Sequence, residues 1–339
     1  MVADLVEYWL GVDTHRDGHQ VVVVDRAGRV VGAVRIEATR CGYRAALACM
    51  RQLASGRRVW AIEGSGSYGA GLARFLVARG ERVVEVERPA RAGRGGRIKD
   101  DLKDAERAAR AAMAGTAGAT PRLAAETQQL RVLVVTRDGI VRDRTRALNE
   151  LHALVITAPD ELRERLTGCS RRRLLDACQA LRGSQPIRLS LRLIAERIRL
   201  HDRHVRQLDE QIQAQVAMIA PQLLERPGVG PTSAAQILVA WSHRGRLRNE
   251  AAFSRLAGVA PIPASSGATT RWRLDRAGDR QLNRALHTIA LTLRRCDPQT
   301  RAFIAQRQAR GKTSREATRL LKRYLARSIY RQLEATTMP

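Results

Sequence analysis

The stretch YWLGVDTHRDGHQVVVVDRAG, residues 8–28, contains two apolar runs separated by a short polar turn. Runs rich in Val, Tyr and Trp that are bounded by Asp, Gly and His are typical of β-strands, and a short polar connection between two of them is typical of a hairpin. The next segment, VVGAVRIEAT at 30–39, has the same character and predicts a third strand. The chain is therefore expected to open with three consecutive strands, which decides its fold class.

Beyond these strands, helical and strand patterns alternate up to about residue 90. Gly80 follows the second helical pattern, where a helix C-cap is expected. Three hairpin strands followed by alternating helices and strands imply an α/β fold with a mixed sheet covered by helices. The ribonuclease-H-like, or RuvC-like, layout has this order and shares it with several other α/β folds. The predicted helices span 42–54 and 68–80, and the further predicted strands span 57–66 and 82–88.

The segment between Pro186 and Pro221 has the most regular helical pattern of the chain. Its apolar residues recur at alternating spacings of four and three, which is the heptad pattern of a coiled coil. An amphipathic helix that packs inside its own domain gives the same pattern, so both interpretations stay open. The seam consists of Ile187, Leu191, Ile194, Ile198, His201, Val205, Leu208, Ile212, Gln215 and Ile219.

Changes in pattern divide the chain into three predicted domains. A RuvC-like domain spans 1–160, a helical coiled-coil segment spans 161–222, and a mostly α-helical C-terminal domain spans 223–339. The last of these opens with RPGVGPTSAAQIL, a helix-hairpin-helix-like motif that is typical of DNA-binding turns. Its glycines let the backbone approach a phosphate, and the N–H groups of the following helix can bind it. The residues that this motif offers to nucleic acid are Gly228, Gly230 and Thr232.

The chain carries 60 Lys and Arg residues against 33 Asp and Glu residues, a formal net charge of +27. Such an excess is typical of proteins that bind polyanions, so nucleic acid is the expected partner. The start of the chain shows no signal-peptide pattern, and no segment approaches about 18 uninterrupted apolar residues, so no membrane association is expected. The five cysteines show no CxxC pairing, which indicates reduced thiols in a cytoplasmic protein.

Acidic residues end two of the predicted strands and open a predicted helix. Asp13 ends the first strand and Glu63 ends the fourth, and adjacent strands would bring them together at one end of the sheet. In RIKDDLKDAERAAR, residues 97–110, Asp101 and Asp104 share one helical face. Four carboxylates this close repel one another unless cations neutralise them. We therefore expect a site for Mg²⁺ or Mn²⁺, with two ions about 4 Å apart suiting phosphodiester chemistry.

Simpler interpretations apply to the same acids and their neighbours. Asp100, Asp101 and Asp104 also suit a helix N-terminus, where the helix dipole favours acids and nearby basic residues pair with them. Polar residues beside Asp13 could form a metal cluster, but a solvent-facing hairpin turn explains their alternation better. The residues of this predicted turn are His15, Asp17 and His19.

A loop rich in Gly, Ser and Thr, PASSGATTRWR at 263–273, lies in the third predicted domain. It places Ser265 and Ser266 directly before Gly267. A serine in such a loop is usually a turn residue and is by itself a weak sign of a nucleophile. The basic residues that follow, and that suit contacts with DNA, are Arg271, Arg273, Arg276 and Arg280.

Taken together, these motifs resemble one family. GVDTH around Asp13, AIEGSG around Glu63 and KDDLKDA at 99–105 resemble the acidic motifs of the DEDD transposases of bacterial insertion sequences, the IS-one-ten family. RPGVGPTSAAQILVA, FSRLAGVAPIPASSGATTRWRLDRAGDRQLNRAL and GKTSREATRLLKRYLARSIYRQL resemble its C-terminal transposase domain. The resemblance spans nearly the whole chain. Asp100 stands where the family pattern has Ser or Thr, which leaves open which Asp faces the metal.

The resemblance implies a transposase, a site-specific DNA recombinase of the bacterial cytoplasm and nucleoid that is guided by an element-encoded bridge RNA. It implies that Ser266, rather than Ser265, attacks donor and target DNA and forms a covalent phosphoserine intermediate. It also implies a site assembled between protomers in a dimer of dimers. The acidic tetrad that would hold Mg²⁺ consists of Asp13, Glu63, Asp101 and Asp104.

Two other functions remain open from the sequence. The first is a metal-dependent nuclease of the Holliday-junction type, which would use the acidic residues and water without the serine. The second is a non-catalytic nucleic-acid-binding protein, in which only the basic surface is retained.

Overall fold

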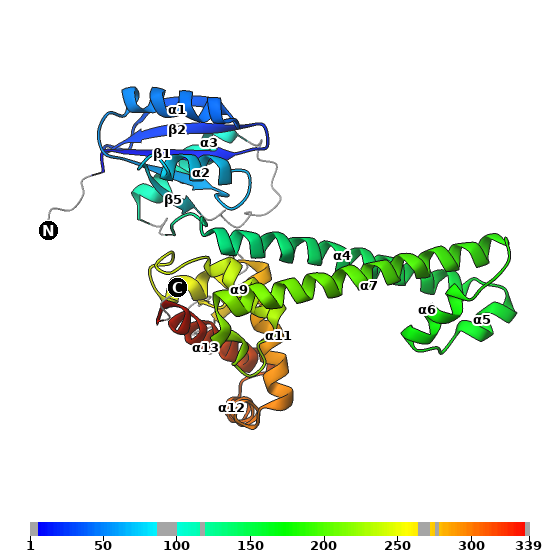
Figure 1. Ribbon diagram of the computed structural model, residues 1–339. Helices are drawn as coiled ribbons and strands as arrows, with labels where there is room; N and C mark the ends of the chain where they lie inside the picture. The colour runs from blue at the N-terminus through cyan, green and yellow to red at the C-terminus, as the bar shows by residue number, and fades with distance from the viewer. Residues whose placement is uncertain (1–5, 87–99, 116–118, 264–271, 275–277, 336–339) are drawn as a thin grey trace. The chain divides into compact units, whose positions relative to one another are not determined.

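The structure, a computed structural model, contains a five-stranded sheet, a two-stranded sheet and thirteen helices among the residues that it describes (Figure 1). None of these helices is long and apolar enough to cross a membrane. The described residues are 6–86, 100–115, 119–263, 272–274 and 278–335.

The chain divides into two compact units. The first unit contains residues 1–128 and 240–339, and the second unit contains residues 129–239. Within the first unit, the hydroxyl oxygens of Thr127 and Ser242 lie 3.4 Å apart, so its two pieces meet next to the ends of the second unit. The borders of the units differ from the predicted domain borders near 160 and 222.

The large sheet of the first unit is mixed, as the sequence predicted. Its strand order is β3-β2-β1-β4-β5. The first three strands pair antiparallel, because short hairpins join them, whereas β4 and β5 extend the sheet in parallel from β1. The strands are β1 (Tyr8–Thr14), β2 (Gly18–Asp25), β3 (Val30–Glu37), β4 (Arg58–Glu63) and β5 (Arg82–Val86).

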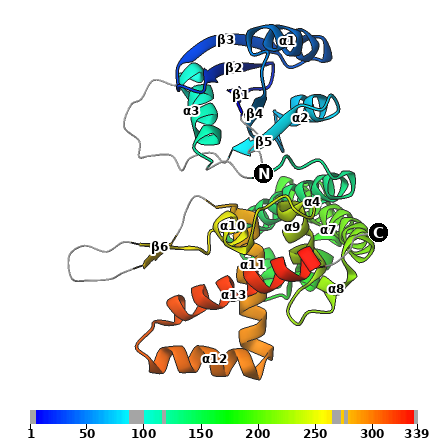
Figure 2. The same cartoon turned by 90° about the vertical axis from the view of Figure 1, so that its left-hand side faces the viewer.

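Helices cover both faces of this sheet (Figure 2). Helices α1 (Arg40–Leu53) and α2 (Ala70–Val77) pack on one face over a core that includes Leu10, Val12 and Trp60. On the other face lies α3 (Asp101–Met113), which contributes mainly alanines to the interface. The alternation of side chains along β1 thus sends Val12 toward one face and its neighbours toward α3.

Helix α3 approaches the sheet at backbone distance over Gly11 of β1. A Cβ atom added at Gly11 would lie 1.9 Å from the carbonyl oxygen of Ala105 and 2.5 Å from the amide nitrogen of Ala109. Any larger residue would therefore force the helix away from the strand. The close contact fixes the first turn of α3 beside the end of β1, where Asp13 lies two residues after Gly11.

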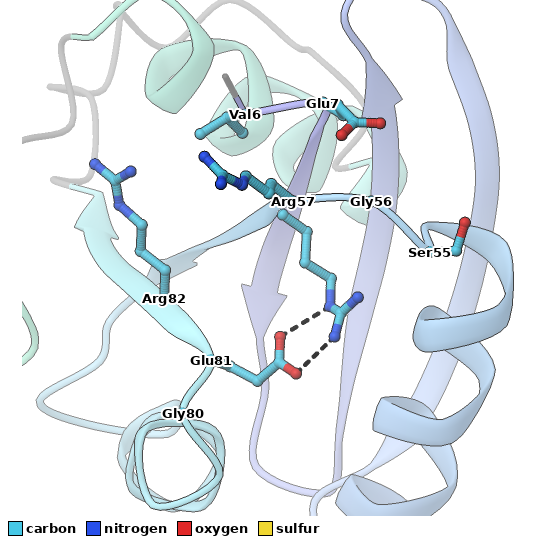
Figure 3. Close-up of a pocket in the computed structure, with 9 residues that line it drawn as sticks. Val6, Glu7, Ser55, Gly56, Arg57, Gly80, Glu81 and Arg82 are labelled. Carbon is cyan, nitrogen blue, oxygen red and sulfur yellow. Dashed lines mark hydrogen bonds and ion pairs between the residues drawn. The ribbon is translucent and has the colours of Figure 1, made fainter. Parts of the chain in front are cut away.

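A buried carboxylate connects the opposite end of the sheet to α1. The side chain of Glu81 is 5% exposed and accepts hydrogen bonds from Nη2 and Nε of Arg58, at 2.7 and 2.8 Å (Figure 3). Trp60 Nε1 donates to the same carboxylate at 3.1 Å, and Arg51 lies 3.2 Å away. Burial alone would raise the pKa of Glu81, but the hydrogen bonds from Arg58 and Trp60 outweigh it and lower the pKa. This cluster borders an open pocket of about 590 Å³ that Glu7 also lines.

The other described residues of the first unit are mostly helical, as predicted for the end of the chain. Trp241 Nε1 donates to Glu334 at 2.7 Å, and the hydroxyl of Tyr330 donates to the Leu247 carbonyl at 2.7 Å, which ties the last helix to the segment before α10. The elements are α10 (Glu250–Leu256), β6 (Pro261–Pro263), β7 (Trp272–Leu274), α11 (Arg280–Cys296), α12 (Pro298–Ala309) and α13 (Ser314–Ala335).

A buried ion pair links the sheet to the C-terminal piece of the first unit. The side chain of Arg246 is 1% exposed and lies 3.0 Å from Glu85 of β5. Arg122 lies 3.6 Å from the other carboxylate oxygen of Glu85. Burial opposes the charge of Glu85, but the two guanidinium groups hold its pKa below the ordinary value.

The second unit is a helical hairpin with smaller helices at its far end. Ion pairs join α4 and α7 in antiparallel register, from Arg137 with Asp209 at 2.5 Å to Arg144 with Asp202 at 3.1 Å. The helices are α4 (Ala125–Ile156), whose first turn belongs to the first unit, α5 (Asp160–Leu166), α6 (Arg171–Gln179), α7 (Pro186–Ile219), α8 (Pro221–Leu224) and α9 (Pro231–Trp241), whose last residues also belong to the first unit.

The predicted heptad seam lies on α7, which is one uninterrupted helix. Leu191, Ile194 and Ile198 of the seam are buried against residues of α4, α5 and α6 in the same chain. The second interpretation of the pattern, an amphipathic helix packed inside its own domain, therefore describes this part of α7. His201 and Gln215, the polar residues of the seam, are half-buried.

Candidate functional site

Two acidic residues end neighbouring parallel strands on the face that α3 covers. Val12 and Ile62 are partners in the pairing of β1 with β4, so Asp13 and Glu63 follow at adjacent positions. Val12 and Ile62 both point into the core below α1 and α2, and alternation sends the next residue of each strand toward α3. The Thr14 hydroxyl donates to the Glu63 carbonyl at 2.8 Å and joins the two strand ends.

Asp100 is the N-cap residue of α3. Its side chain accepts hydrogen bonds from the backbone N–H groups of Leu102 and Lys103, as an N-cap residue does. The Lys103 ammonium lies 3.0 Å from the same carboxylate, and this hydrogen bond is the main reason why the pKa of Asp100 is lowered. The simpler interpretation of the acidic segment therefore holds for Asp100.

The next two acids of α3 differ in their surroundings. Asp101 opens the helix with its side chain 47% exposed, and it lies toward the end of β1. Asp104, one turn later, forms an ion pair with Arg107 and is half-buried. Asp104 is therefore paired within its own helix, as expected if these acids only stabilise a helix N-terminus.

His15 connects the strand end to the helix. Its Nε2 atom lies 3.0 Å from Asp13 Oδ2 and 3.3 Å from Asp101 Oδ2. His15 lies in the turn that the sequence predicted, with its side chain 37% exposed, but it also contacts both acids. The solvent-facing turn is wrong for His19, which is 1% exposed and stacks on Tyr43. Burial in that stack lowers the pKa of His19.

The residues at this point suit a divalent cation. Asp13, His15 and Asp101 each offer one ligand atom, and these atoms all lie within 4.8 Å of one another. Asp13 is 4% exposed, so its carboxylate needs a positive partner more than a surface acid does. Among the described residues, the group does not extend to Glu63 or Asp104. The structure thus brings together two of the four predicted acids and adds a histidine.

The predicted nucleic-acid-binding turn precedes α9. Gly228 has a φ of +79°, a conformation that favours glycine, and α9 begins at Pro231, directly after Gly230. Thr232 lies in the first turn of this helix and is half-buried.

The predicted serine loop lies mostly outside the described residues. This applies to Ser265 and Ser266, and to the basic residues Arg271 and Arg276. The other two residues that the sequence predicted to contact DNA lie among the described residues. Arg273 pairs with Ile262 through the backbone of the two-stranded sheet, and the exposed Arg280 opens α11.

Comparison with known proteins covers both halves of the chain. Residues 10–158, which include the acidic site, match the model of the DEDD-type IS110 transposases, described as "Transposase". Residues 220–305, which include the predicted serine loop, match the model "Transposase IS116/IS110/IS902 family". The chain belongs to the IS110 family of insertion-sequence transposases. Its membership makes it an enzyme of DNA transposition.

Two curated insertion-element proteins are similar to this IS110-family chain. One is the "Insertion element IS900 uncharacterized 42 kDa protein" of Mycobacterium paratuberculosis, which is 26% identical over 371 aligned positions covering 93% of this chain and 92% of the relative. The other is the "Insertion element IS110 uncharacterized 43.6 kDa protein" of Streptomyces coelicolor, which is 35% identical over 115 positions covering 33% of this chain and 28% of the relative.

The family and the geometry agree on the type of cofactor. Membership of the DEDD-type transposases suggests use of a divalent metal, and the group of Asp13, His15 and Asp101 lies within the region that matches them. Oxygen and nitrogen ligands of this kind suit a divalent cation.

Proposed function

We propose that this IS110-family transposase cuts and rejoins DNA strands through a covalent phosphoserine intermediate, with divalent cations held by the acidic site. The observation that carries the proposal is the convergence of Asp13 and Asp101, from a strand and a helix nearly 90 residues apart, on one small volume. Glu63 at the adjacent strand end and Asp104 on the next turn of α3 complete the proposed tetrad.

The proposed covalent step conserves the phosphodiester bond. The Ser266 hydroxyl gives up its proton and attacks a DNA phosphorus atom, so that an Oγ–P bond forms and the bond from phosphorus to the 3′ oxygen breaks. The leaving 3′ oxygen takes a proton and becomes a free hydroxyl. The reverse attack by a 3′ hydroxyl of another strand breaks the Oγ–P bond and rejoins DNA without an external energy source.

The acidic residues have a defined part in this step. Divalent cations on the tetrad would stabilise charge on the attacking and leaving oxygens. The chain's own contribution is to hold Asp13 buried on β1 and Asp101 at the start of α3, where Asp100 caps the helix and Gly11 lets it approach the sheet.

Asp13→Asn tests the acidic site. Asparagine keeps the size of the side chain but removes its charge. The rate of strand cleavage in Mg²⁺ should therefore fall at least about a hundredfold. Mutation of a residue that only supports a metal ligand usually has a smaller effect. The assay measures cleavage of DNA that carries the ends of the element. Asp17→Asn is the matched control, because Asp17 lies in the turn that follows β1, with its side chain 79% exposed. Cleavage that survives Asp13→Asn would favour the non-catalytic interpretation of this site.

A guide RNA and a dimer of dimers belong to the same proposal. A net charge of +27 with only 4% aromatic residues supports a protein that contacts nucleic-acid backbones and leaves base recognition to pairing between strands. We expect one defined transcript from the flank of the element to co-purify with the protein, identified by RNA sequencing, and a tetramer in sedimentation of the complex with DNA. Random cellular RNA in the same preparation would contradict guidance by RNA.

A further inference from the structure

We propose that His15 is a nitrogen ligand of the cation held between Asp13 and Asp101, and that it gives this metal position a preference for Mn²⁺ over Mg²⁺. The inference rests on the proposed function in one respect, since it requires that the acidic site binds a divalent cation. It adds a residue outside the acidic tetrad and a chemical preference to that site.

The distances around His15 match those between neighbouring ligands of one ion. In octahedral coordination with bonds of about 2.1 Å, adjacent ligand atoms are separated by about 3.0 Å, which is the bond length multiplied by the square root of two. His15 Nε2 lies 3.0 Å from Asp13 Oδ2 and 3.3 Å from Asp101 Oδ2. The 3.0 Å contact is a hydrogen bond between the imidazole and the Asp13 carboxylate, and all three ligand atoms lie within 4.8 Å of one another. A cation that replaces this hydrogen bond can therefore contact all three atoms after side-chain movements.

The local fold holds His15 on the same side as Asp13. Residues two apart in an extended strand project to the same face, and His15 directly follows the last residue of β1. Its backbone N–H donates to the Gly18 carbonyl at 3.1 Å, which closes the tight turn into β2. The imidazole is thus supported by a hairpin, while Asp101 is positioned by the capped start of α3. Ligands on such regular elements are held more closely than ligands on long loops.

The nature of the third ligand decides which metal is preferred. Mg²⁺ binds oxygen ligands and retains water, whereas imidazole nitrogen suits first-row transition metals. Four carboxylates alone would favour Mg²⁺ or Mn²⁺ without a strong distinction. A nitrogen from His15 shifts the preference toward Mn²⁺, which accepts both kinds of ligand.

Electron spin-echo envelope modulation of Mn²⁺ bound to the full-length protein tests this inference directly. We expect modulation from a coordinated ¹⁴N nucleus, which changes to the ¹⁵N pattern when the protein is produced with ¹⁵N-histidine. His15→Gln keeps a polar side chain near the carboxylates but lacks the imidazole. It should abolish the nitrogen modulation and weaken Mn²⁺ affinity at least about tenfold, with a smaller change in Mg²⁺ affinity measured by competition.

The controls separate this inference from the proposed function. His204→Gln changes an exposed histidine of α7 and should leave the nitrogen modulation intact. Mn²⁺ that binds in an Asp13-dependent manner without histidine modulation overturns the role of His15 and leaves the acidic site in place. Mn²⁺ binding that Asp13→Asn does not weaken, or no Mn²⁺ binding at all, overturns both. The isotope-labelled wild-type protein gives a decision even if the His15 variant fails to fold.

Discussion

Ser266→Ala is expected to abolish covalent attachment of the protein to DNA. Alanine lacks the hydroxyl oxygen that would form the bond to phosphorus, so the loss should be complete rather than partial. The measurement traps complexes between the protein and end-labelled element DNA under denaturing conditions, where only a covalent adduct stays attached. Because Ser266 lies outside the described residues, this prediction rests on its position directly before Gly267 in the family-like loop.

Ser265→Ala is the matched control, since it removes the same atoms one residue earlier. It should keep the covalent adduct, and an adduct lost only in Ser265→Ala would move the nucleophile by one position. A third outcome is informative about the reaction. If Ser266→Ala still cleaves DNA at the normal rate, water is the nucleophile and the enzyme is a metal-dependent nuclease of the junction-cutting type.

Glu81→Ala is expected to lower the free energy of unfolding by about 3–5 kcal/mol, the usual cost of removing one partner from a buried ion pair. The variant removes the charged acceptor of the Arg58 guanidinium, which is 13% exposed, and of the indole N–H of Trp60, while Arg58 keeps its hydrogen bond to the Ala54 carbonyl. Chemical denaturation at neutral pH measures the change. Glu7→Ala is the control, because Glu7 is an exposed carboxylate beside the same pocket and should change stability by less than about 0.5 kcal/mol.

The pH dependence of this effect has a defined sign. The pKa of Glu81 is lower in the folded protein than in the unfolded chain, so its charge stabilises the fold at all pH values above the ordinary glutamate pKa of about 4.3. That contribution declines as the pH falls below this value and disappears as the pH passes the lowered pKa. The stability difference between wild type and Glu81→Gln should therefore shrink in acid, and a difference that grows there would contradict the assigned ion pair.

The sheet is the part of the fold that the sequence predicts best. Strands β1 and β2 occupy the two apolar runs of residues 8–28, and the other three strands agree with their predicted spans to within about three residues. Short hairpins and a period of two are local properties, so they are visible in one sequence. The pattern of α7 was equally visible, but a heptad seam has the same spacing whether its partner is α4 in the same chain or a second protomer.

The sequence alone could not predict which acid caps α3 and which lies beside His15. Asp100 and Asp101 are consecutive, and which of them caps the helix depends on where α3 begins. The structure starts α3 at Asp101, which makes Asp100 the cap and leaves Asp101 beside His15. Their roles toward a metal remain predictions.

His15 and Glu81 share the reason why sequence analysis misjudged or missed them. His15 contacts Asp101, which lies more than 80 residues later in the chain. Glu81 contacts Arg58, which lies 23 residues earlier. A polar residue at a strand end or after a glycine has the pattern of an ordinary turn, and only the folded chain shows which distant side chains it contacts. Arg246 and Glu85, 161 residues apart, are a further pair of this kind.

The meeting of Thr127 and Ser242 makes the second unit an insertion within a folded body. Because its entry and exit lie side by side, equal numbers of helical turns can be added to α4 and α7, or removed from them, without altering the ends that return to the first unit. The length of this hairpin can therefore change without any change to the five-stranded sheet and the acidic site. Alignment with the IS900 protein needs 371 positions for a chain of 339 residues, so the family does vary in length.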